Sequence, residues 1–276
     1  MKYPVVLTIA GSDSVGGAGI QADIKAISAT GGYAASAITA VTVQNTTGVR
    51  AVHNVPVEIV RGQIEAVIGD IGADAVKIGM LSTAGLVRAV KDSLTGLGVT
   101  NIVLDPVMVA TSGDRLIDGD AVEVLATELA PFARVVTPNI PEAEILSGEK
   151  ITSQADLPGV AGRLSARLSS LGDRPVSVLL KAGHLDEDYL VDYFFNAETG
   201  RISELSSRRV LSRNTHGTGC TLSSALASYL AQGFSLDDAA RRAKAYVARA
   251  IETGAAFDIG HGHGPVHHFW VLDHHS

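Results

Sequence analysis

The chain enters its first structural unit with the sequence Val5-Val6-Leu7-Thr8-Ile9-Ala10-Gly11-Ser12-Asp13-Ser14-Val15-Gly16-Gly17-Ala18-Gly19-Ile20-Gln21-Ala22-Asp23. Residues 5–10 form a short apolar run without polar alternation, which is typical of a strand buried on both faces of a sheet. The glycine-rich segment after it favours a tight turn, and residues 18–30 have the spacing of a helix. A strand, a glycine-rich turn and a helix in this order predict the start of a βαβ unit.

The same alternation continues along the chain. We expect further strands at Ala34–Val43, Asp74–Ile78, Asn101–Asp105, Arg134–Thr137 and Val176–Lys181, and a hairpin at Val191–Asn196 and Arg201–Leu211. We expect helices at Val57–Gly69, Thr83–Leu97, Asp118–Leu129, Gln154–Leu171, Thr218–Gln232 and Leu236–Thr253. No long linker, low-complexity tract or fixed-period repeat interrupts this pattern. The sequence therefore predicts one α/β domain over residues 1–276, with a mainly parallel sheet covered on both faces.

Composition, net charge and cysteine count limit the classes of protein to which the chain can belong. The chain has 276 residues, of which 46% are hydrophobic and 18% charged, and its net charge is −7. An acidic surface gives no basic footprint for nucleic acid, and no apolar run approaches the roughly 18 residues of a membrane span. The single cysteine, Cys220, excludes an intramolecular disulfide and fits a reducing compartment. We expect a cytoplasmic protein without a nucleic-acid or membrane partner.

The turn after the first strand allows three interpretations. Gly17, Gly19 and Ala22 match the G-x-G-x-x-A form of a dinucleotide fingerprint, which needs an acidic residue about 20 positions further on. No Asp or Glu occurs between Asp23 and Glu58. This gap argues against a dinucleotide site and leaves either a tight turn or a backbone that approaches a small substrate closely.

Several predicted strands end in polar residues, at the edge where α/β sheets bind ligands. The Gln44 carboxamide could pair with a ring nitrogen and an exocyclic amine, or lie solvated in a loop. Asp105 could hold Mg²⁺ or cap a turn, and Lys181 could neutralise a phosphate or be solvated. Glu142 follows Pro141 and could bind a metal or simply favour a helix N-terminus.

The segment Asn214-Thr215-His216-Gly217-Thr218-Gly219-Cys220-Thr221-Leu222-Ser223-Ser224-Ala225 places a Gly-x-Gly turn directly before a helix of small residues. Free N–H groups at such a helix start bind anions, and glycines let a phosphate approach. In the first turn, the helix dipole and a nearby cation would favour the thiolate of Cys220; the alternative is a buried structural cysteine. No Gly-Lys dipeptide occurs, which excludes a Walker A loop.

Histidines cluster near the end of the chain, at His261, His263, His267, His268, His274 and His275. Such a cluster can bind metal adventitiously. The flexible His-Gly-His-Gly pattern and the scarcity of nearby carboxylates and cysteines argue against a built zinc site.

Taken together, these motifs resemble those of the hydroxymethylpyrimidine/phosphomethylpyrimidine kinases of thiamin biosynthesis. The motifs that carry the resemblance are Thr42-Val43-Gln44-Asn45-Thr46, Asp105-Pro106-Val107-Met108, Thr137-Pro138-Asn139 and Thr215-His216-Gly217-Thr218-Gly219-Cys220-Thr221. The resemblance implies a ribokinase-like three-layer αβα sandwich with a mainly parallel central sheet and without a separate lid domain. It also implies ATP as co-substrate, Mg²⁺ and a homodimer.

Roles for single residues follow from the resemblance. It implies Cys220 as catalytic base with Gly217 and Gly219 beside it, because the wider superfamily has Gly-Ala-Gly-Asp where this chain has Gly217-Thr218-Gly219-Cys220. It implies substrate contacts at Gln44, Gly11, Asp23, Met80 and Val107, ATP contacts at Lys181, Asn139, Thr215 and Thr218, and Mg²⁺-shell carboxylates at Asp105 and Glu142. The chain departs from the family's Lys-Gly-Gly-His at Lys181-Ala182-Gly183-His184, which puts the phosphate contacts of that loop in question.

Other functions remain open at this point. A pyridoxal-type kinase of the same fold would also phosphorylate a hydroxymethyl group on a flat heteroaromatic ring. A dinucleotide-dependent oxidoreductase would use Gly17, Gly19 and Ala22. A ligand-binding regulator would bind the pyrimidine without ATP turnover.

Overall fold

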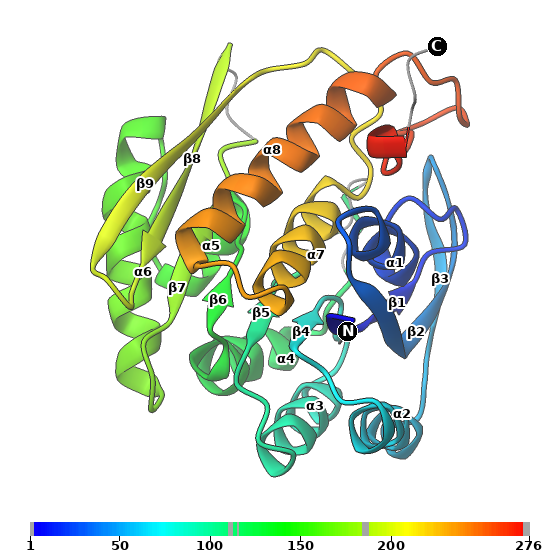
Figure 1. Ribbon diagram of the computed structural model, residues 1–276, viewed down its shortest axis with the longest axis vertical. Coiled ribbons are helices and arrows are strands. Elements are labelled where there is room, and N and C mark those ends of the chain that lie inside the picture. The colour runs from blue at the N-terminus through cyan, green and yellow to red at the C-terminus, as the bar shows by residue number, and fades with distance from the viewer. Residues whose placement is uncertain (1–2, 110–112, 115, 184–187, 273–276) are drawn as a thin grey trace.

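A single large sheet organises the protein, for which a computed structural model describes residues 3–109, 113–114, 116–183 and 188–272. The strands are β1 (Val5–Ser12), β2 (Tyr33–Asn45), β3 (Gly48–Asn54), β4 (Ala75–Ile78), β5 (Ile102–Leu104), β6 (Val135–Val136), β7 (Ser177–Leu180), β8 (Tyr189–Asn196) and β9 (Arg201–Arg208). They form a nine-stranded sheet in the order β3-β2-β1-β4-β5-β6-β7-β8-β9 (Figure 1).

The six central strands, from β2 through β1 to β7, run parallel, whereas β3, β8 and β9 pair antiparallel at the two edges. Strand β1 lies between β2 and β4. The chain therefore leaves β1 toward one side of the sheet and later continues on the other. This reversal creates a crevice beyond the carboxyl ends of the strands, where α/β sheets bind ligands.

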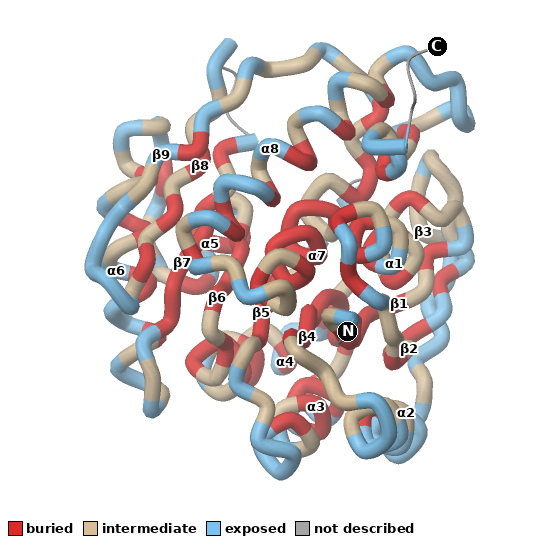
Figure 2. The backbone as a smooth tube through the Cα atoms, viewed as in Figure 1, coloured by how far each residue is buried: buried red, intermediate tan, exposed pale blue. Residues whose placement is uncertain are grey.

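Helices cover both faces of the sheet and make it the middle of three layers. The helices are α1 (Gly19–Ala29), α2 (Val57–Asp70), α3 (Ala84–Gly96), α4 (Gly119–Val124), α5 (Ile140–Ser147), α6 (Leu157–Leu171), α7 (Thr218–Ala231) and α8 (Leu236–Gly254). One apolar core joins the sheet to α2, α3, α4, α5 and α6, and a second joins it to α1, α7 and α8. Figure 2 shows α7 as a largely buried helix, consistent with its position between the sheet and α8.

The predicted alternation of strands and helices and the hairpin after β7 are confirmed, and so is the α/β fold class. Two elements were not predicted as such. Strand β3 is an exposed antiparallel edge strand, so it lacks the buried apolar run by which the parallel strands were recognised. Helix α5 spans only eight residues and was anticipated only through its N-terminal Pro141 and Glu142. The segment predicted as a helix at Asp118–Leu129 divides into α4 and a π-helical turn at Leu125–Leu129.

Among the described residues, no helix has both the length and the apolar character needed to cross a bilayer.

Candidate active site

A cavity of about 790 Å³ opens at the carboxyl edge of the parallel strands and extends to the start of α7 and the outer part of α8. With the exception of Asp23, every residue to which the family resemblance assigned a role lines this cavity. These residues are Gly11, Gln44, Met80, Asp105, Val107, Asn139, Glu142, Lys181, Thr215, Gly217, Thr218, Gly219 and Cys220. The fold thus brings together motifs that lie up to about 200 residues apart in the chain.

The loop between β1 and α1 is held by the buried carboxylate of Asp13. Its oxygens accept hydrogen bonds from the backbone N–H groups of Val15, Gly17 and Ala18 at 2.8–3.0 Å, and one oxygen lies 2.9 Å from Nε2 of His216. Burial acts to raise the pKa of Asp13, but the hydrogen bond with His216 and those from the backbone hold this pKa below its ordinary value. Asp13 therefore joins the glycine-rich loop after β1 to the segment that precedes α7.

The start of α7 requires glycine at position 217. Gly217 has φ +80°, and a Cβ on it would lie only 1.8 Å from the carbonyl oxygen of Gly17. The glycine-rich loop and the start of α7 consequently meet backbone to backbone. A Cβ on Gly219 would lie 3.2 Å from Lys181 Nζ and 3.4 Å from Asp105 Oδ2, so the first turn of α7 faces these two charges. A helix N-terminus beside a lysine is a suitable cradle for a phosphate.

Lys181, Asp105 and Glu142 form a buried charge cluster next to this helix start. Lys181 Nζ donates to Asp105 Oδ1 at 2.9 Å, and Thr137 Oγ1 donates to the same oxygen at 3.1 Å. Burial works to raise the pKa of Asp105, but Lys181 and Lys77 outweigh it and keep this pKa below its ordinary value. For Glu142, burial is the largest effect; Lys181 opposes it, Asp105 adds to it, and the pKa rises to about 7.

The two carboxylates fit a Mg²⁺ site of the kind that keeps waters and substrate phosphates as its remaining ligands. Lys181 carries one positive charge beside these two acids, and burial raises the pKa of Glu142 to about 7. Glu142 also forms a capping box with Asn139: Asn139 N donates to its carboxylate at 2.8 Å, and Glu142 N donates to Asn139 Oδ1 at 2.9 Å. Among the described residues, no third histidine, cysteine or acid completes a closed protein cage for a metal.

Cys220 lies in the first turn of α7 and is partly exposed to the cavity. Burial in the site raises the pKa of its thiol to about 11, while Lys77 and a hydrogen bond from the backbone of Gly19 act in the opposite direction. At neutral pH Cys220 is therefore a protonated thiol. The predicted thiolate is wrong under these conditions, because loss of solvent outweighs the stabilisation that a helix start and a cation provide.

Asp23 and Lys77 form an ion pair under the floor of the cavity. Lys77 Nζ lies 2.8 and 2.9 Å from the two oxygens of Asp23, and both side chains are 0% exposed. Asp23 also accepts hydrogen bonds from Thr8 Oγ1 at 2.6 Å and Ser224 Oγ at 2.7 Å. Since Asp23 is fully engaged and does not line the cavity, it supports the wall instead of facing a substrate.

Gly11, Met80 and Val107 line a mostly apolar part of the cavity, called the slot below. A Cβ on Gly11 would lie 3.1 Å from the sulfur of Met80, so the thioether packs against this stretch of backbone. Gln44 reaches the slot from the end of β2, where its Oε1 accepts from Thr42 Oγ1 at 3.1 Å and its Nε2 lies 3.5 Å from His216 Nε2. Val107 closes the slot from the segment after β5.

The loop after β7 tolerates its departure from the family pattern. Ala182 is buried, and its N–H donates to Asp192 Oδ1 at 2.9 Å; Lys244 Nζ binds the other oxygen of Asp192 at 2.7 Å. No described residue other than glycine has positive φ, so Ala182 adopts an ordinary backbone conformation. Its methyl group therefore introduces no strain beside Lys181. His184, the last residue of that motif, lies outside the described part of the chain.

The histidine-rich segment near the end of the chain packs against the site. His216 N donates to the carbonyl of Gly264 at 3.0 Å, and His263 N donates to that of Thr46 at 2.8 Å. His268 is buried with its Nε2 3.0 Å from Thr221 Oγ1 on α7. The segment thus connects the end of β2 with the start of α7. His274 and His275 fall outside the described residues.

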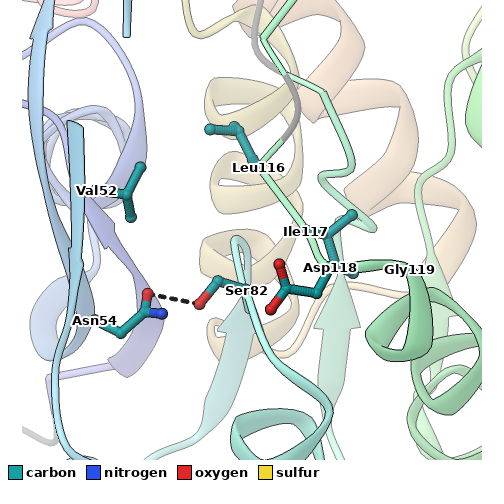
Figure 3. A pocket seen from close by; sticks show the side chains of 7 residues that line it. All are labelled: Val52, Asn54, Ser82, Leu116, Ile117, Asp118 and Gly119. Carbon is teal, nitrogen blue, oxygen red and sulfur yellow. Dashed lines mark hydrogen bonds between the residues drawn. The ribbon is translucent and has the colours of Figure 1, made fainter. Parts of the chain in front are cut away.

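A second, smaller cavity of about 290 Å³ lies between β3 and the start of α4 (Figure 3). Ser82 Oγ donates to Asn54 Oδ1 at 2.7 Å across its base, and Asp118 flanks it. Its described lining residues include none of the candidate site residues.

Sequence reasoning missed three important side chains of the site, namely Lys77, Asp13 and His216. Lys77 gave a signal, because a lysine inside the apolar run Ala75-Val76-Lys77-Ile78 must find a buried partner. Asp13 and His216 lie within motifs that were recognised, but their pairing across 203 residues becomes visible only in the fold.

Comparison with known protein families agrees with this geometry. Residues 13–267 match the family model described as phosphomethylpyrimidine kinase. The chain belongs to this family. It is 48% identical over 272 residues to the hydroxymethylpyrimidine/phosphomethylpyrimidine kinase of Rhizobium meliloti, covering 98% of this chain and 99% of that protein. It is also 49% identical over 268 residues to the thiamine biosynthesis bifunctional protein ThiED of Geobacter sulfurreducens, covering 97% of this chain and 53% of that protein.

The chain shares its fold with solved structures of a phosphomethylpyrimidine kinase and a pyridoxal kinase. The phosphomethylpyrimidine kinase of Clostridium difficile aligns with a TM-score of 0.76 and 43% identity, over 90% of this chain and 99% of its own. An ADP complex of Bacillus subtilis pyridoxal kinase aligns with a TM-score of 0.86 and 32% identity, over 98% of this chain and 99% of its own. The implied ribokinase-like architecture is thereby confirmed.

We predict that Gly217→Ala destabilises the protein by roughly 2–5 kcal/mol, because the methyl group meets the Gly17 carbonyl and the backbone conformation is strained. Denaturant unfolding measures this change. Gly85→Ala is the matched control: position 85 lies inside α3 with open space around it, so alanine should leave stability unchanged or raise it by about 1 kcal/mol. Equal stabilities of the Gly217→Ala variant and the wild type would contradict the backbone contact.

A second prediction concerns His268. Burial lowers its pKa from 6.5 to about 4. The unfolded chain therefore takes up this proton first as the pH falls, so the stabilisation is complete above pH 6.5 and is lost between pH 6.5 and 4, by up to about 3 kcal/mol.

The test compares the urea unfolding free energy across this pH range for the wild type, His268→Gln and the exposed control His261→Gln. We expect a shallower pH dependence only in His268→Gln. Parallel curves for all three proteins would show that His268 does not titrate in this way.

Proposed function

We propose that the protein transfers the γ-phosphoryl group of ATP to 4-amino-5-hydroxymethyl-2-methylpyrimidine, and then a second one to the resulting monophosphate, as in thiamin biosynthesis. The observation that carries this proposal is the shared cavity. The first turn of α7 with Cys220 and Lys181, which suits a phosphate, lines the same cavity as Gly11, Gln44, Met80 and Val107, which suit a flat ring. This arrangement suits a phosphoryl donor and a flat alcohol acceptor in one chamber.

In this proposal the aminopyrimidine occupies the slot of Gly11, Met80 and Val107. The Gln44 carboxamide provides one donor and one acceptor to the ring nitrogen and the exocyclic amine. Gln44 is anchored by Thr42, which fixes the position from which it reads this edge. The hydroxymethyl group then points toward the start of α7.

The triphosphate lies over the first turn of α7, with Asn139, Thr215 and Thr218 among its neighbours. The N–H groups from Gly217 to Cys220 and the Lys181 ammonium stabilise the charge that develops on the transferred group. Asp105 and Glu142 would hold Mg²⁺, which neutralises phosphate charge in kinases of this kind. Asp192 would support the phosphate site indirectly. It accepts a hydrogen bond from the N–H of Ala182 and so fixes the loop that carries Lys181.

Cys220 is proposed as the base. Its thiolate takes the proton of the hydroxymethyl oxygen, that oxygen bonds to the γ-phosphorus, and the bond from this phosphorus to the bridging oxygen breaks, releasing ADP. The transfer depends mainly on positioning and charge, so a small thiolate fraction can suffice. The resulting phosphate could remain at the same helix start as the acceptor of a second transfer.

Pyridoxal is a second candidate substrate, favoured by the likeness to the pyridoxal kinase structure. Product analysis with the pyrimidine or pyridoxal, ATP and Mg²⁺ tests the proposal by counting the phosphates added to each alcohol. We expect mono- and then diphosphorylated pyrimidine, with a higher kcat/KM than for pyridoxal. Binding of the pyrimidine without ADP formation, or turnover of pyridoxal alone, would overturn it. The homodimer remains a prediction, which light scattering can test.

For the base we predict that Cys220→Ala lowers kcat by about 10²–10⁴-fold while KM for the pyrimidine changes only a few-fold, because the thiol acts on the proton and not on the ring. Cys220→Ser keeps the size but loses the acidity, so it should be impaired like the alanine variant. Wild-type kcat in the purified Cys220→Ala variant would exclude Cys220 as the base.

A further inference from the structure

A hydrogen bond joins α1 to α7 close to the thiol. Ser224 Oγ donates to Asp23 Oδ1 at 2.7 Å. Residues four apart share one face of a helix, so Cys220 lies on the same face of α7 as Ser224, one turn before it. Cys220 therefore lies one turn from Asp23 along the contact between these helices.

Lys77 extends into this contact from the central strand β4. Its Nζ binds both oxygens of Asp23, and a Cβ on Gly79 would lie 2.8 Å from the same nitrogen. Lys77 lines the cavity, whereas Asp23 does not. The ammonium group therefore lies on the cavity side of the carboxylate, and Cys220 lines the same cavity.

Four described charged groups act on the thiol from the elements around it: Lys77 of β4, Asp23 of α1, Asp105 after β5 and Lys181 after β7. Lys181 is bound by Asp105 at 2.9 Å and faces the proposed phosphate site. Burial raises the pKa of Cys220, and Lys77 is the leading charge that works against this rise. A fully buried ion pair seldom adds net stability compared with apolar side chains, so stability alone does not account for Lys77.

We propose that Lys77 is the counter-charge of the Cys220 thiolate and that Asp23 fixes this lysine beneath the thiol. The inference rests on the proposed role of Cys220 as base, and Lys77 acts on the reaction through Cys220. The thiolate accepts the substrate's hydroxyl proton and becomes a neutral thiol. Lys77 therefore favours the form of Cys220 that can accept a proton, and Asp23 holds the lysine in position.

The single cysteine makes the test direct, because every thiol signal comes from Cys220. The rate of alkylation by iodoacetamide is measured by mass spectrometry from pH 7 to 10, without added metal or nucleotide, for Asp23→Asn and for the double variant Asp23→Asn/Lys77→Met. These two proteins differ only in the lysine charge, and neither contains a buried unpaired carboxylate. We expect the double variant to react at least about tenfold more slowly at equal pH, because its apparent thiol pKa is higher.

The single variant Asp23→Asn should react faster than the wild type, since it removes a negative charge near the thiol while Asp105 and the thiolate remain as counter-charges for Lys77. If the ion pair between Asp23 and Lys77 were purely structural, the result would differ. The single and the double variant would then both loosen the site and change the access of iodoacetamide to the thiol in the same direction. Lys150→Met in the Asp23→Asn background is the matched control, because the Lys150 side chain is 86% exposed and should leave the rate unchanged. Denatured samples of all variants should react alike.

Equal alkylation rates at each pH in the single variant Asp23→Asn and the double variant would overturn the inference. Its failure is distinguishable from failure of the proposed function, because alkylation requires no turnover. If Cys220→Ala retained full kcat, the role of Cys220 as base would be lost, whereas the effect of Lys77 on the thiol would still be measured. If both hold, adding Lys77→Met to Asp23→Asn lowers kcat about tenfold at neutral pH and leaves KM for ATP within a few-fold.

Discussion

The carboxylate of Asp13 is the interaction on which the site depends. It gathers three N–H groups of the loop after β1 and reaches His216 in the segment before α7. Once these two segments are joined, the carbonyl of Gly17 lies against Gly217, so no side chain fits between them. The direction in which α7 begins is thereby set, and with it the position of every free N–H group in its first turn.

The buried charges near α7 are arranged as pairs. Asp23 is matched by Lys77 and Asp105 by Lys181, at distances of 2.8–2.9 Å. Leaving one ion of such a pair unmatched in the interior would cost several kcal/mol. Glu142 is the acid that exceeds this balance, and burial raises its pKa to about 7. The cluster could therefore accept an additional cation, in line with the proposed binding of Mg²⁺ by Asp105 and Glu142.

The sequence was sufficient for the parts of the molecule that repeat a local pattern. The parallel strands, their helices and the Gly-x-Gly start of α7 follow from apolar periodicity and turn residues, and the ends of these strands supplied most of the cavity wall. The exposed edge strand β3 and the short α5 carry too weak a pattern to be recognised in this way. The pairing of the buried charged residues was the main feature that the sequence did not predict. Lys77 meets Asp23 across 54 residues, and a spacing of that kind has no local signature. The protonation state of the Cys220 thiol was also predicted incorrectly. It depends on how much solvent the cavity walls exclude, and these walls come from segments that are far apart in the sequence.

These charges give a physical reason for a cysteine at position 220, where the wider superfamily resembled by this chain has an aspartate. A carboxylate here would be a further permanent negative charge near Asp23 and Asp105, in a site that must also accept phosphates. A thiol is neutral when protonated, so it can be buried at little cost, and only its minor deprotonated fraction is an anion that can accept a proton. The proposed base therefore needs a nearby cation that is not used by the phosphates. Lys181 is the lysine proposed to bind the phosphates, whereas Lys77 is paired with Asp23 one helical turn from Cys220. The proposed base and the buried lysine are therefore best understood as one unit, in which Lys77 provides the positive charge that stabilises the thiolate.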